Sequence, residues 1–225
     1  MRIIIITQNE PFYLKNNLEY LISILPNNHK IVGCIVNSAS PFGKKETFFE
    51  KVFKTFNVFG LKFFLYYSTK FVISKIFKQP IKSFLKKNNI PNIKLKTSVN
   101  SKDSLNKIKS YNPDLIVSIL GNQIFKKELI DLAPKGCINL HTALLPKYRG
   151  LMPTFWVMKN NEKYTGVSVF FVDEGIDSGS IIQQEKITIY KNDTIKSLQK
   201  RLQVVEHDLY PNVIEKILSK KLQYY

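Results

Sequence analysis

The sequence is poor in the residues that build disulfide frameworks and metal sites. Its 225 residues include two cysteines and three histidines, too few for a disulfide scaffold or a cysteine-rich metal site. Cys34 and Cys137 both lie in apolar runs that are typical of strands, so we expect buried, reduced thiols. No internal repeat and no low-complexity linker is visible. We therefore expect a globular protein, and we predict no metal site.

We also expect no signal peptide at the start of the given sequence. Residues 1–7 are too short for a signal peptide and contain no small-residue cleavage site, which predicts a cytoplasmic protein. Hydrophobic residues make up 44% of the chain and charged residues 23%. This is the composition of a globular chain that can bury a proper core.

Acidic residues are scarce as well. Lysine and arginine total 34 against 17 aspartates and glutamates, which gives a formal net charge of +17 and an isoelectric point near 9.7. Such a balance favours nucleic acid, an anionic membrane surface or a phosphorylated substrate as a partner. The chain is also rich in Lys, Asn and Ile and poor in Arg, Ala and Gly. That pattern is equally typical of a biased coding composition, so both interpretations stay open.

Residues 44–96 hold thirteen lysines, two glutamates and many phenylalanines. Phe49, Val52, Phe53 and Phe56 recur at helical spacing and predict a helix. No stretch of 18 residues here is free of charge, so we expect no transmembrane helix. A basic amphipathic helix of this kind can lie on a membrane surface. Alternatively, the phenylalanines pack on the domain and the lysines face water.

Short apolar runs alternate with helical patterns through the first 140 residues. This alternation predicts an α/β fold: a doubly wound, mostly parallel sheet with helices on both faces. We expect strands at residues 2–7, 30–36, 92–97, 115–120 and 136–140. We expect helices at residues 14–25, 101–110 and 126–132.

Beyond residue 140, the runs at 167–172 and 181–189 predict two further strands that form a hairpin. A capped helix follows them and runs toward the end of the sequence. We assign residues 1–190 to one domain, which includes the basic, aromatic helical segment 44–90. We assign residues 191–225 to a C-terminal helix packed on the same domain.

A polar pair, Asn139 and His141, stands at the end of the predicted strand 136–140. Because side chains alternate faces along a strand, residues two apart point the same way. Open α/β sheets bind their ligands at the carboxyl ends of strands. An amide N–H beside a protonated imidazole can stabilise an oxyanion, and imidazole also titrates near neutral pH. A capped strand end or a satisfied histidine would explain the pair equally well.

An acidic loop, Val172-Asp173-Glu174-Gly175-Ile176-Asp177-Ser178-Gly179, lies between two predicted strands. Its glycines allow a left-handed backbone and a close approach to a ligand. If Asp177 lies beside His141, its carboxylate favours the charged imidazole and can order a water for proton transfer. A Ca²⁺ site is a competing interpretation, but the spacing does not fit an EF-hand and the acids are too few. A plain acidic turn also stays open.

Taken together, these segments resemble the formyltransferase family that uses 10-formyltetrahydrofolate. That family includes glycinamide ribonucleotide transformylase, methionyl-tRNA formyltransferase and the amino-sugar N-formyltransferases. The resemblance covers about residues 90–205 and rests on Asn139-x-His141, Leu144-Leu145-Pro146, Arg149-Gly150 and, 36 residues past His141, Asp177-Ser178-Gly179. It implies a Rossmann-like formyltransferase fold, with Asn139, His141 and Asp177 at the catalytic positions.

The resemblance also implies a mechanism that needs no metal. A neutral amine attacks the formyl carbon, while Asn139 and His141 stabilise the oxyanion. Asp177 keeps His141 charged and helps to move the amine proton to the leaving nitrogen of the folate. The implied folate contacts, largely through backbone groups, are Asn122, Gln123, Ile124, Phe125, Val172, Asp173, Glu174 and Gly175. Asn122 and Gln123 are not the commonest residues of the family at their positions.

Features that the sequence does not contain reduce the number of candidate acceptors. Thr7-Gln8-Asn9-Glu10-Pro11 follows the first predicted strand, where glycinamide ribonucleotide transformylases carry a glycine-rich phosphate loop. Without glycine, no backbone cradle for phosphate is expected there. The given sequence ends about 35 residues past its last predicted strand, so we expect no C-terminal barrel of the kind that methionyl-tRNA formyltransferases carry. Formyltetrahydrofolate hydrolases have an extra N-terminal regulatory domain, whereas the first strand here is expected from Arg2.

We therefore favour an amino-sugar N-formyltransferase that acts on a nucleotide-linked sugar for a surface polysaccharide. Lys147, Tyr148 and Arg149 could meet phosphates, and Trp156 could stack on a sugar or base. Core packing of Trp156 and structural pairing of Arg149 are the alternatives. The basic segment 44–96 could cover the acceptor site, mediate a homodimer or touch membrane-bound acceptors.

Other functions stay open beside this one. Glycinamide ribonucleotide and methionyl-tRNA are alternative acceptors within the same family. A non-catalytic basic protein on this scaffold, which contacts nucleic acid or membrane, is an alternative from another class. The presence of Asn139, His141 and Asp177 together argues against it, because a binding module would not need all three.

Overall fold

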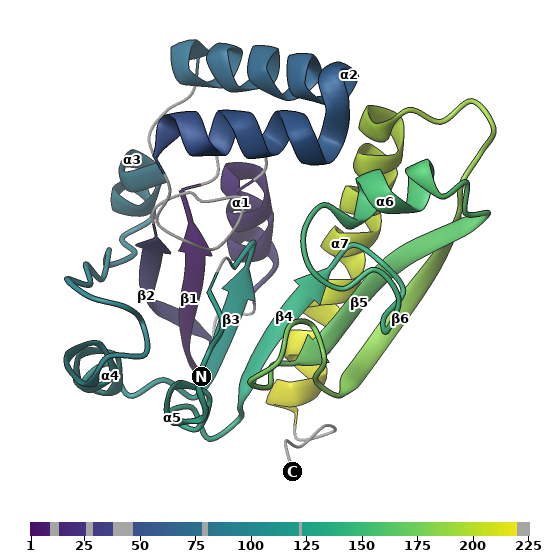
Figure 1. Ribbon diagram of the computed structural model, residues 1–225. Coiled ribbons are helices and arrows are strands. Elements are labelled where there is room, and N and C mark those ends of the chain that lie inside the picture. Colours follow the sequence, from purple (N-terminus) through teal and green to yellow (C-terminus); the bar gives the residue numbers. More distant parts are fainter. Residues whose placement is uncertain (10–13, 26–28, 38–46, 78–80, 122, 220–225) are drawn as a thin grey trace.

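A mixed sheet of six strands organises the molecule (Figure 1). The computed structural model describes residues 1–9, 14–25, 29–37, 47–77, 81–121 and 123–219. The strands are β1 (Arg2–Gln8), β2 (Lys30–Asn37), β3 (Leu115–Ile119), β4 (Cys137–His141), β5 (Tyr164–Phe171) and β6 (Ile181–Thr188). They lie in the order β2-β1-β3-β4-β5-β6. The first four are parallel, and β5 runs antiparallel to both β4 and β6.

Strand β1 shows why helices cover both faces of the sheet. Ile3 to Ile6 are all fully buried, and their side chains alternate between the faces. Ile3 and Ile5 enter one core with helices α1 (Leu14–Ile24), α3 (Ile81–Lys87) and α7 (Ile195–Leu218). Ile4 and Ile6 enter a second core with α4 (Lys102–Lys109) and α5 (Lys127–Ile130). The predicted doubly wound α/β fold is confirmed.

Helix α2 (Phe48–Phe77) is the helix predicted within the basic segment, and it is not straight. Gly60 has a φ of 77°, and the helix folds back there into a hairpin (Figure 1). A left-handed backbone of this kind favours glycine. Phe59 and Phe63 next to the kink pack against Phe155 of α6 (Pro153–Lys159), with ring centroids 5.0 and 5.2 Å apart. The hairpin therefore attaches to the domain through aromatic contacts.

Helix α7 begins at a reciprocal cap. The Thr194 hydroxyl accepts from the backbone N–H of Ser197 at 3.1 Å, and the Ser197 hydroxyl accepts from the backbone N–H of Thr194 at 2.9 Å. Such a box satisfies two of the N–H groups that a helix start leaves unpaired. The helix then packs on β5, β6, α1 and α6. This position makes it one side of the cavity described below.

The predicted strand at residues 92–97 is not formed. Asn92 makes a single bridge to Cys34 of β2, and the Ile93 N–H donates to the Cys34 carbonyl at 2.8 Å. Ile93 is buried in the second core, where an added Cβ on Gly33 would collide with it. Apolar and polar residues alternate over residues 92–97 without forming a further strand. The alternation places the side chain of Ile93 beside β2.

Both cysteines are buried free thiols, as predicted. Burial raises the pKa of Cys34 to about 12 and raises that of Cys137 as well, so neither forms a nucleophilic thiolate near neutral pH. Within the described residues, no helix is long and apolar enough to cross a membrane. The same residues contain no group of three or more His, Cys, Asp or Glu side chains arranged to hold a metal ion.

Candidate active site

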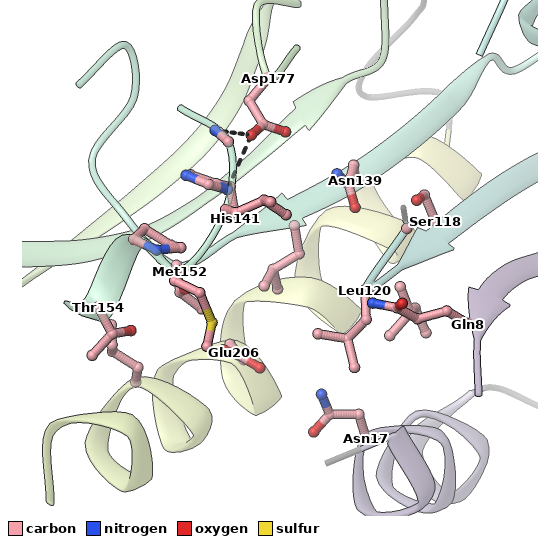
Figure 2. A pocket seen from close by; sticks show the side chains of 18 of the residues that line it. Gln8, Asn17, Ser118, Leu120, Asn139, His141, Met152, Thr154, Asp177 and Glu206 are labelled. Atoms are coloured by element: carbon pink, nitrogen blue, oxygen red, sulfur yellow. Dashed lines mark hydrogen bonds and ion pairs between the residues drawn. The ribbon is translucent and has the colours of Figure 1, made fainter. Parts of the chain in front are cut away.

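The carboxyl end of β4 brings Asn139 and His141 to a cavity of about 770 Å³ (Figure 2). Asn139 lies opposite Ser118 of β3 in the parallel register, and His141 lies opposite Ser168 of β5. The cavity thus opens where the parallel part of the sheet meets its antiparallel part. Asp177, from the loop between β5 and β6, lines the same cavity. The structure brings these three residues together.

Both ring nitrogens of His141 face hydrogen-bond acceptors. Nε2 lies 2.7 Å from the carbonyl oxygen of Tyr148. Nδ1 lies 3.3 Å from Oδ2 of Asp177, as Figure 2 shows. A carbonyl oxygen can only accept, so Nε2 carries a hydrogen. A carboxylate at Nδ1 is best satisfied when that nitrogen carries a hydrogen too. Both ring nitrogens of His141 are therefore placed to donate hydrogen bonds to these neighbours.

Asp177 joins three parts of the chain. Besides facing His141, its Oδ2 accepts from the backbone N–H of Gly150 at 2.8 Å. One carboxylate thus links the end of β4, the loop after β4 and the loop after β5. Tyr148, Gly150, Met152 and Asp177 all have left-handed backbones, with φ of 59°, 88°, 54° and 47°. Glycine adopts this backbone freely, whereas the other three residues are strained there, and such residues cluster at functional sites.

Asn139 has an unsatisfied polar atom. Its Oδ1 is buried and finds no hydrogen-bond partner among the described residues. The two ends of an amide are assigned from their partners, so the unpaired end can be either the oxygen or the nitrogen. An unpaired buried polar group beside a cavity indicates a place for a ligand group.

The glycines of the loop after β5 act by close approach. An added Cβ on Gly179 would collide with the backbone of β5, and one on Gly175 would collide with the Ser178 hydroxyl. The left-handed residue of the loop is Asp177, so the expectation of left-handed glycines there is wrong. Asp173 Oδ1 accepts from the Gly175 N–H at 3.0 Å and from the Ser178 hydroxyl at 2.7 Å. This acid therefore holds the loop in shape.

The residues expected to contact folate are only partly brought to the cavity. Five of them line it: Gln123, Ile124, Phe125, Val172 and Gly175. Asp173 and Glu174 lie outside the lining, and Glu174 Oε1 instead accepts from the Lys127 N–H at 3.3 Å. Asn122 lies outside the described residues.

The residues expected to contact the acceptor are not brought to the cavity. All four lie outside its lining: Lys147, Tyr148, Arg149 and Trp156. The Tyr148 hydroxyl donates to Glu162 Oε1 at 2.7 Å. Trp156 packs edge-on against Phe155 at 5.1 Å between ring centroids, which agrees with its alternative interpretation as a packing residue. Lys147 and Arg149 are exposed.

Three helices supply cavity residues that were not predicted. They are Asn17 and Tyr20 of α1, Phe63, Tyr66, Tyr67 and Lys70 of α2, and Gln199, Gln203, Glu206 and His207 of α7. For the α7 residues, the sequence contained a pattern that could have predicted their position. Gln199, Gln203 and Glu206 recur at helical spacing beside the buried Leu198 and Leu202, which predicts a polar stripe next to the core-facing stripe.

Glu206 is the carboxylic acid of α7 whose pKa is shifted by its surroundings. It is partly buried in the cavity wall, and desolvation raises its pKa from 4.5 to about 7. Its neighbour His207 stacks on Tyr20 at 4.1 Å between ring centroids. One helix turn earlier, Gln203 donates to Asn17 Oδ1 at 3.1 Å. The α1–α7 side of the cavity is thus polar, whereas the α2 side is aromatic.

The sequence is similar to proteins of a known family. The model of the Formyl transferase family matches residues 69–214. The methionyl-tRNA formyltransferase of Clostridioides difficile (strain 630) is 39% identical over 149 residues, which are 66% of this chain and 45% of that protein. The methionyl-tRNA formyltransferase of Thermodesulfovibrio yellowstonii is 41% identical over 113 residues, 50% of this chain and 37% of that protein. The chain thus spans less than half the length of these curated relatives.

Solved structures share the fold. Phosphoribosylglycinamide formyltransferase from Bacillus halodurans superposes with a TM-score of 0.68 at 24% identity, over 99% of this chain and 97% of that one. A sugar N-formyltransferase from Shewanella sp. FDAARGOS_354 gives a TM-score of 0.62 at 22% identity, over 100% of this chain and 73% of that one. Likeness at these identities concerns the fold alone. The family model, however, covers well over half of the sequence, including β4 and the Asp177 loop, and the chain therefore belongs to the formyl transferase family.

Proposed function

We propose that this protein transfers a formyl group from 10-formyltetrahydrofolate to a primary amine. One observation carries the proposal: the His141–Asp177 pair and the unpaired amide of Asn139 line the same cavity. Donors and charges arranged in advance around a reacting oxygen are the main source of catalysis in acyl transfer. Membership of the formyl transferase family supports the same chemistry.

The residues present fit a folate donor. Its pterin would lie against Gln123, Ile124 and Phe125 on one side and Val172 and Gly175 on the other, all of which line the cavity. Such sites are mostly apolar with a few polar groups that fix orientation. The unpaired amide of Asn139 is a polar group of that kind. When bound, the folate supplies the formyl carbon.

Asn139 and His141 stabilise negative charge on the formyl oxygen in this mechanism. Nε2 of His141 contacts the Tyr148 carbonyl at 2.7 Å. The formyl oxygen must therefore replace this carbonyl before it can accept a hydrogen bond from Nε2. Asp177 remains beside Nδ1 during this exchange, and its carboxylate holds the imidazole ring in place. The loop after β4, which carries Tyr148, is the part that must move.

The reaction balances with one proton transfer. The amine nitrogen bonds to the formyl carbon while the bond between that carbon and the folate nitrogen breaks. One proton passes from the amine to the folate nitrogen. The His141–Asp177 pair is the group at the cavity that can hold or move this proton. Alignment of the two substrates in one cavity supplies a further part of the rate.

For the acceptor, we propose the amino group of a nucleotide-linked sugar. The segment Thr7-Gln8-Asn9-Glu10-Pro11, at the carboxyl end of β1 and just beyond it, contains no glycine that could cradle a free phosphoribosyl group. Phe63, Tyr66 and Tyr67 line the cavity and offer aromatic faces to a sugar or base. Methionyl-tRNA is the second candidate, because the Clostridioides difficile relative is a methionyl-tRNA formyltransferase at 39% identity.

A panel of acceptors tests the proposal. The protein is incubated with 10-formyltetrahydrofolate and, separately, with nucleotide-linked amino sugars, glycinamide ribonucleotide and methionyl-tRNA, and each product is examined by mass spectrometry. A formyl mass increment on an amino sugar supports the proposal, and an increment on methionyl-tRNA favours the second candidate. The His141→Ala protein, prepared in parallel, excludes a contaminating enzyme. The absence of an increment on every amine would overturn formyl transfer.

A further inference from the structure

Helix α2 exposes apolar side chains that no described residue covers. Nine of its large apolar residues are between 40% and 81% exposed: Phe48, Phe49, Phe53, Phe56, Val58, Leu61, Leu65, Val72 and Ile73. The described residues include sixteen exposed large apolar side chains in all, so more than half belong to this one helix. Apolar residues scattered singly over a surface are ordinary, whereas a gathered set indicates an interaction surface.

The exposed side chains follow helical spacing in each segment of the hairpin. The sets are Phe49, Phe53 and Phe56 before the kink, and Leu61, Leu65 and Val72 after it. Residues at such spacings share one side of a helix. Phe59 and Phe63 next to the kink are buried and pack on α6 instead. Each segment therefore has an apolar stripe beyond the one that attaches it to the domain.

Positive charge gathers in the same part of the chain. Residues 44–96 carry thirteen lysines against two glutamates, and so hold most of the net charge of +17 in less than a quarter of the sequence. A biased coding composition would spread lysine evenly, so it does not account for this clustering. Lys54 and Lys62 of α2 are exposed. The exposed lysines of α3 are Lys82, Lys86 and Lys87.

We propose that the α2 hairpin docks the protein on an anionic lipid surface. Its apolar stripes would enter the boundary between headgroups and acyl chains, and its lysines would meet the negative headgroups. A second copy of this chain would present the same positive charge and be repelled. A nucleic acid would pair with the lysines but leave the phenylalanines in water. The same hairpin lines the cavity with Phe63, Tyr66 and Tyr67. Docking would therefore place the cavity close to the bilayer, with α2 between them.

Vesicle flotation with the full chain tests this proposal. Vesicles of phosphatidylcholine alone are compared with vesicles that also contain phosphatidylglycerol. We expect the protein to float with the anionic vesicles, to float poorly with the neutral ones, and to bind less as salt screens the charges. Equal binding to both kinds of vesicle, or no binding to either, would overturn the proposal.

Charge-matched variants locate the lipid contact. One variant reverses three lysines of α2: Lys51→Glu, Lys54→Glu and Lys62→Glu. Its control reverses three exposed lysines elsewhere on the chain: Lys102→Glu, Lys109→Glu and Lys126→Glu. We expect the α2 variant to lose more than about tenfold in anionic-vesicle binding and the control to lose less than about threefold. Equal losses would show that the overall charge, not the hairpin, governs binding, and would sink the proposal.

The apolar stripe has a separate test. Phe49 and Phe53 are 81% and 67% exposed, so a Phe49→Ser/Phe53→Ser variant should keep the fold, which circular dichroism checks. We expect this variant to lose most of its vesicle binding and to match the wild type in size-exclusion chromatography. If the wild type elutes as a dimer, the variant as a monomer, and neither binds vesicles, a second copy covers this face and the lipid proposal is wrong.

Discussion

The catalytic floor and the aromatic wall of the cavity are held in place by different forces. The catalytic floor (Asn139, His141 and Asp177) is organised by hydrogen bonds, with His141 fixed at both ring nitrogens. The aromatic wall (Phe63, Tyr66 and Tyr67) belongs to α2, where the Phe63 and Tyr67 rings stack at 5.7 Å. Directional hydrogen bonds fix a reacting group within fractions of an ångström, as chemistry requires. Aromatic faces tolerate ligands of more than one shape.

This difference separates two kinds of effect. A change on the catalytic floor should alter how fast a bound acceptor is formylated, because it alters groups that the proposed mechanism uses in the transition state. A change on the aromatic wall should alter how tightly the acceptor is held, because it alters contact area. Variants of the two regions should therefore differ in whether the rate constant or the binding of the acceptor changes.

Removal of the imidazole should have the largest effect. We expect His141→Ala to lower the single-turnover rate of formyl transfer by about a thousandfold or more, since it removes a donor to the oxyanion and the proton-transfer group. The matched control is His207→Ala, which changes the other histidine lining the cavity and should keep the rate within about tenfold of wild type. Equal losses in the two variants would mean that His141 has no special role.

Gly179→Ala should disturb the catalytic floor without removing any of its functional groups. The new Cβ would collide with the Phe171 carbonyl, so the loop that carries Asp177 must shift. We expect a rate loss of about a hundredfold and a loss of about 1–3 kcal/mol in the free energy of unfolding. Gly60→Ala in α2 is the control, because it introduces backbone strain but no collision: nothing lies within 4 Å of the new Cβ. The free energy of unfolding should fall in this variant, and the rate of formyl transfer should stay the same.

Glu206, on the polar side of the cavity, should make the stability of the protein depend on pH. Burial raises the pKa of Glu206 to about 7 from an ordinary value of 4.5. The folded protein then keeps a proton that the unfolded chain has lost, so stability falls as pH rises from about 4.5 to about 7. We expect Glu206→Gln to remove about 2 kcal/mol of this fall, measured by urea unfolding at pH 5 and pH 8. Parallel pH profiles for variant and wild type would contradict the burial of this carboxyl.

A change on the aromatic wall should have the smallest effect. Tyr67→Leu keeps a large apolar side chain but removes an aromatic face from the cavity. We expect the KM of the acceptor to rise about fivefold to tenfold and kcat to change by less than about threefold. Arg149→Ala, at an exposed position outside the cavity lining, is the control and should leave both constants nearly unchanged. A large fall in kcat for Tyr67→Leu would contradict the assignment of rate effects to the catalytic floor and binding effects to the aromatic wall.

The position of Asn139 and His141 at the end of one strand could be predicted from the sequence, because it follows from local rules. Strand alternation puts Asn139 and His141 on one side of β4, and the acidic loop returns along the neighbouring strand. The proximity of Asp177 to His141 came from the family resemblance, since spacing alone left a Ca²⁺ loop and a plain turn open. The buried runs of β1, β3 and β4 could be predicted for the same local reason.

The aromatic wall could not be predicted in detail. Helical spacing predicted the helix, but the side of α2 that faces the cavity depends on the kink at Gly60 and on contacts with Phe155. The loop after β4 was misjudged for another reason. The residue types of Lys147, Tyr148 and Arg149 suggested side-chain contacts with a ligand. The structure instead turns the backbone carbonyl of Tyr148 toward His141, and residue types carry no information on backbone groups.

The central claim is that the charge of Asp177 serves the chemistry and not only the architecture of the loop. Asp177→Asn separates the two, because the amide oxygen can still accept from the Gly150 N–H at the position now occupied by Oδ2, while the negative charge beside His141 is lost. The decisive measurement is the rate of formyl transfer by this variant under saturating substrates. We predict a fall of about a hundredfold or more with unchanged thermal unfolding. A rate within about twofold of wild type would contradict the account.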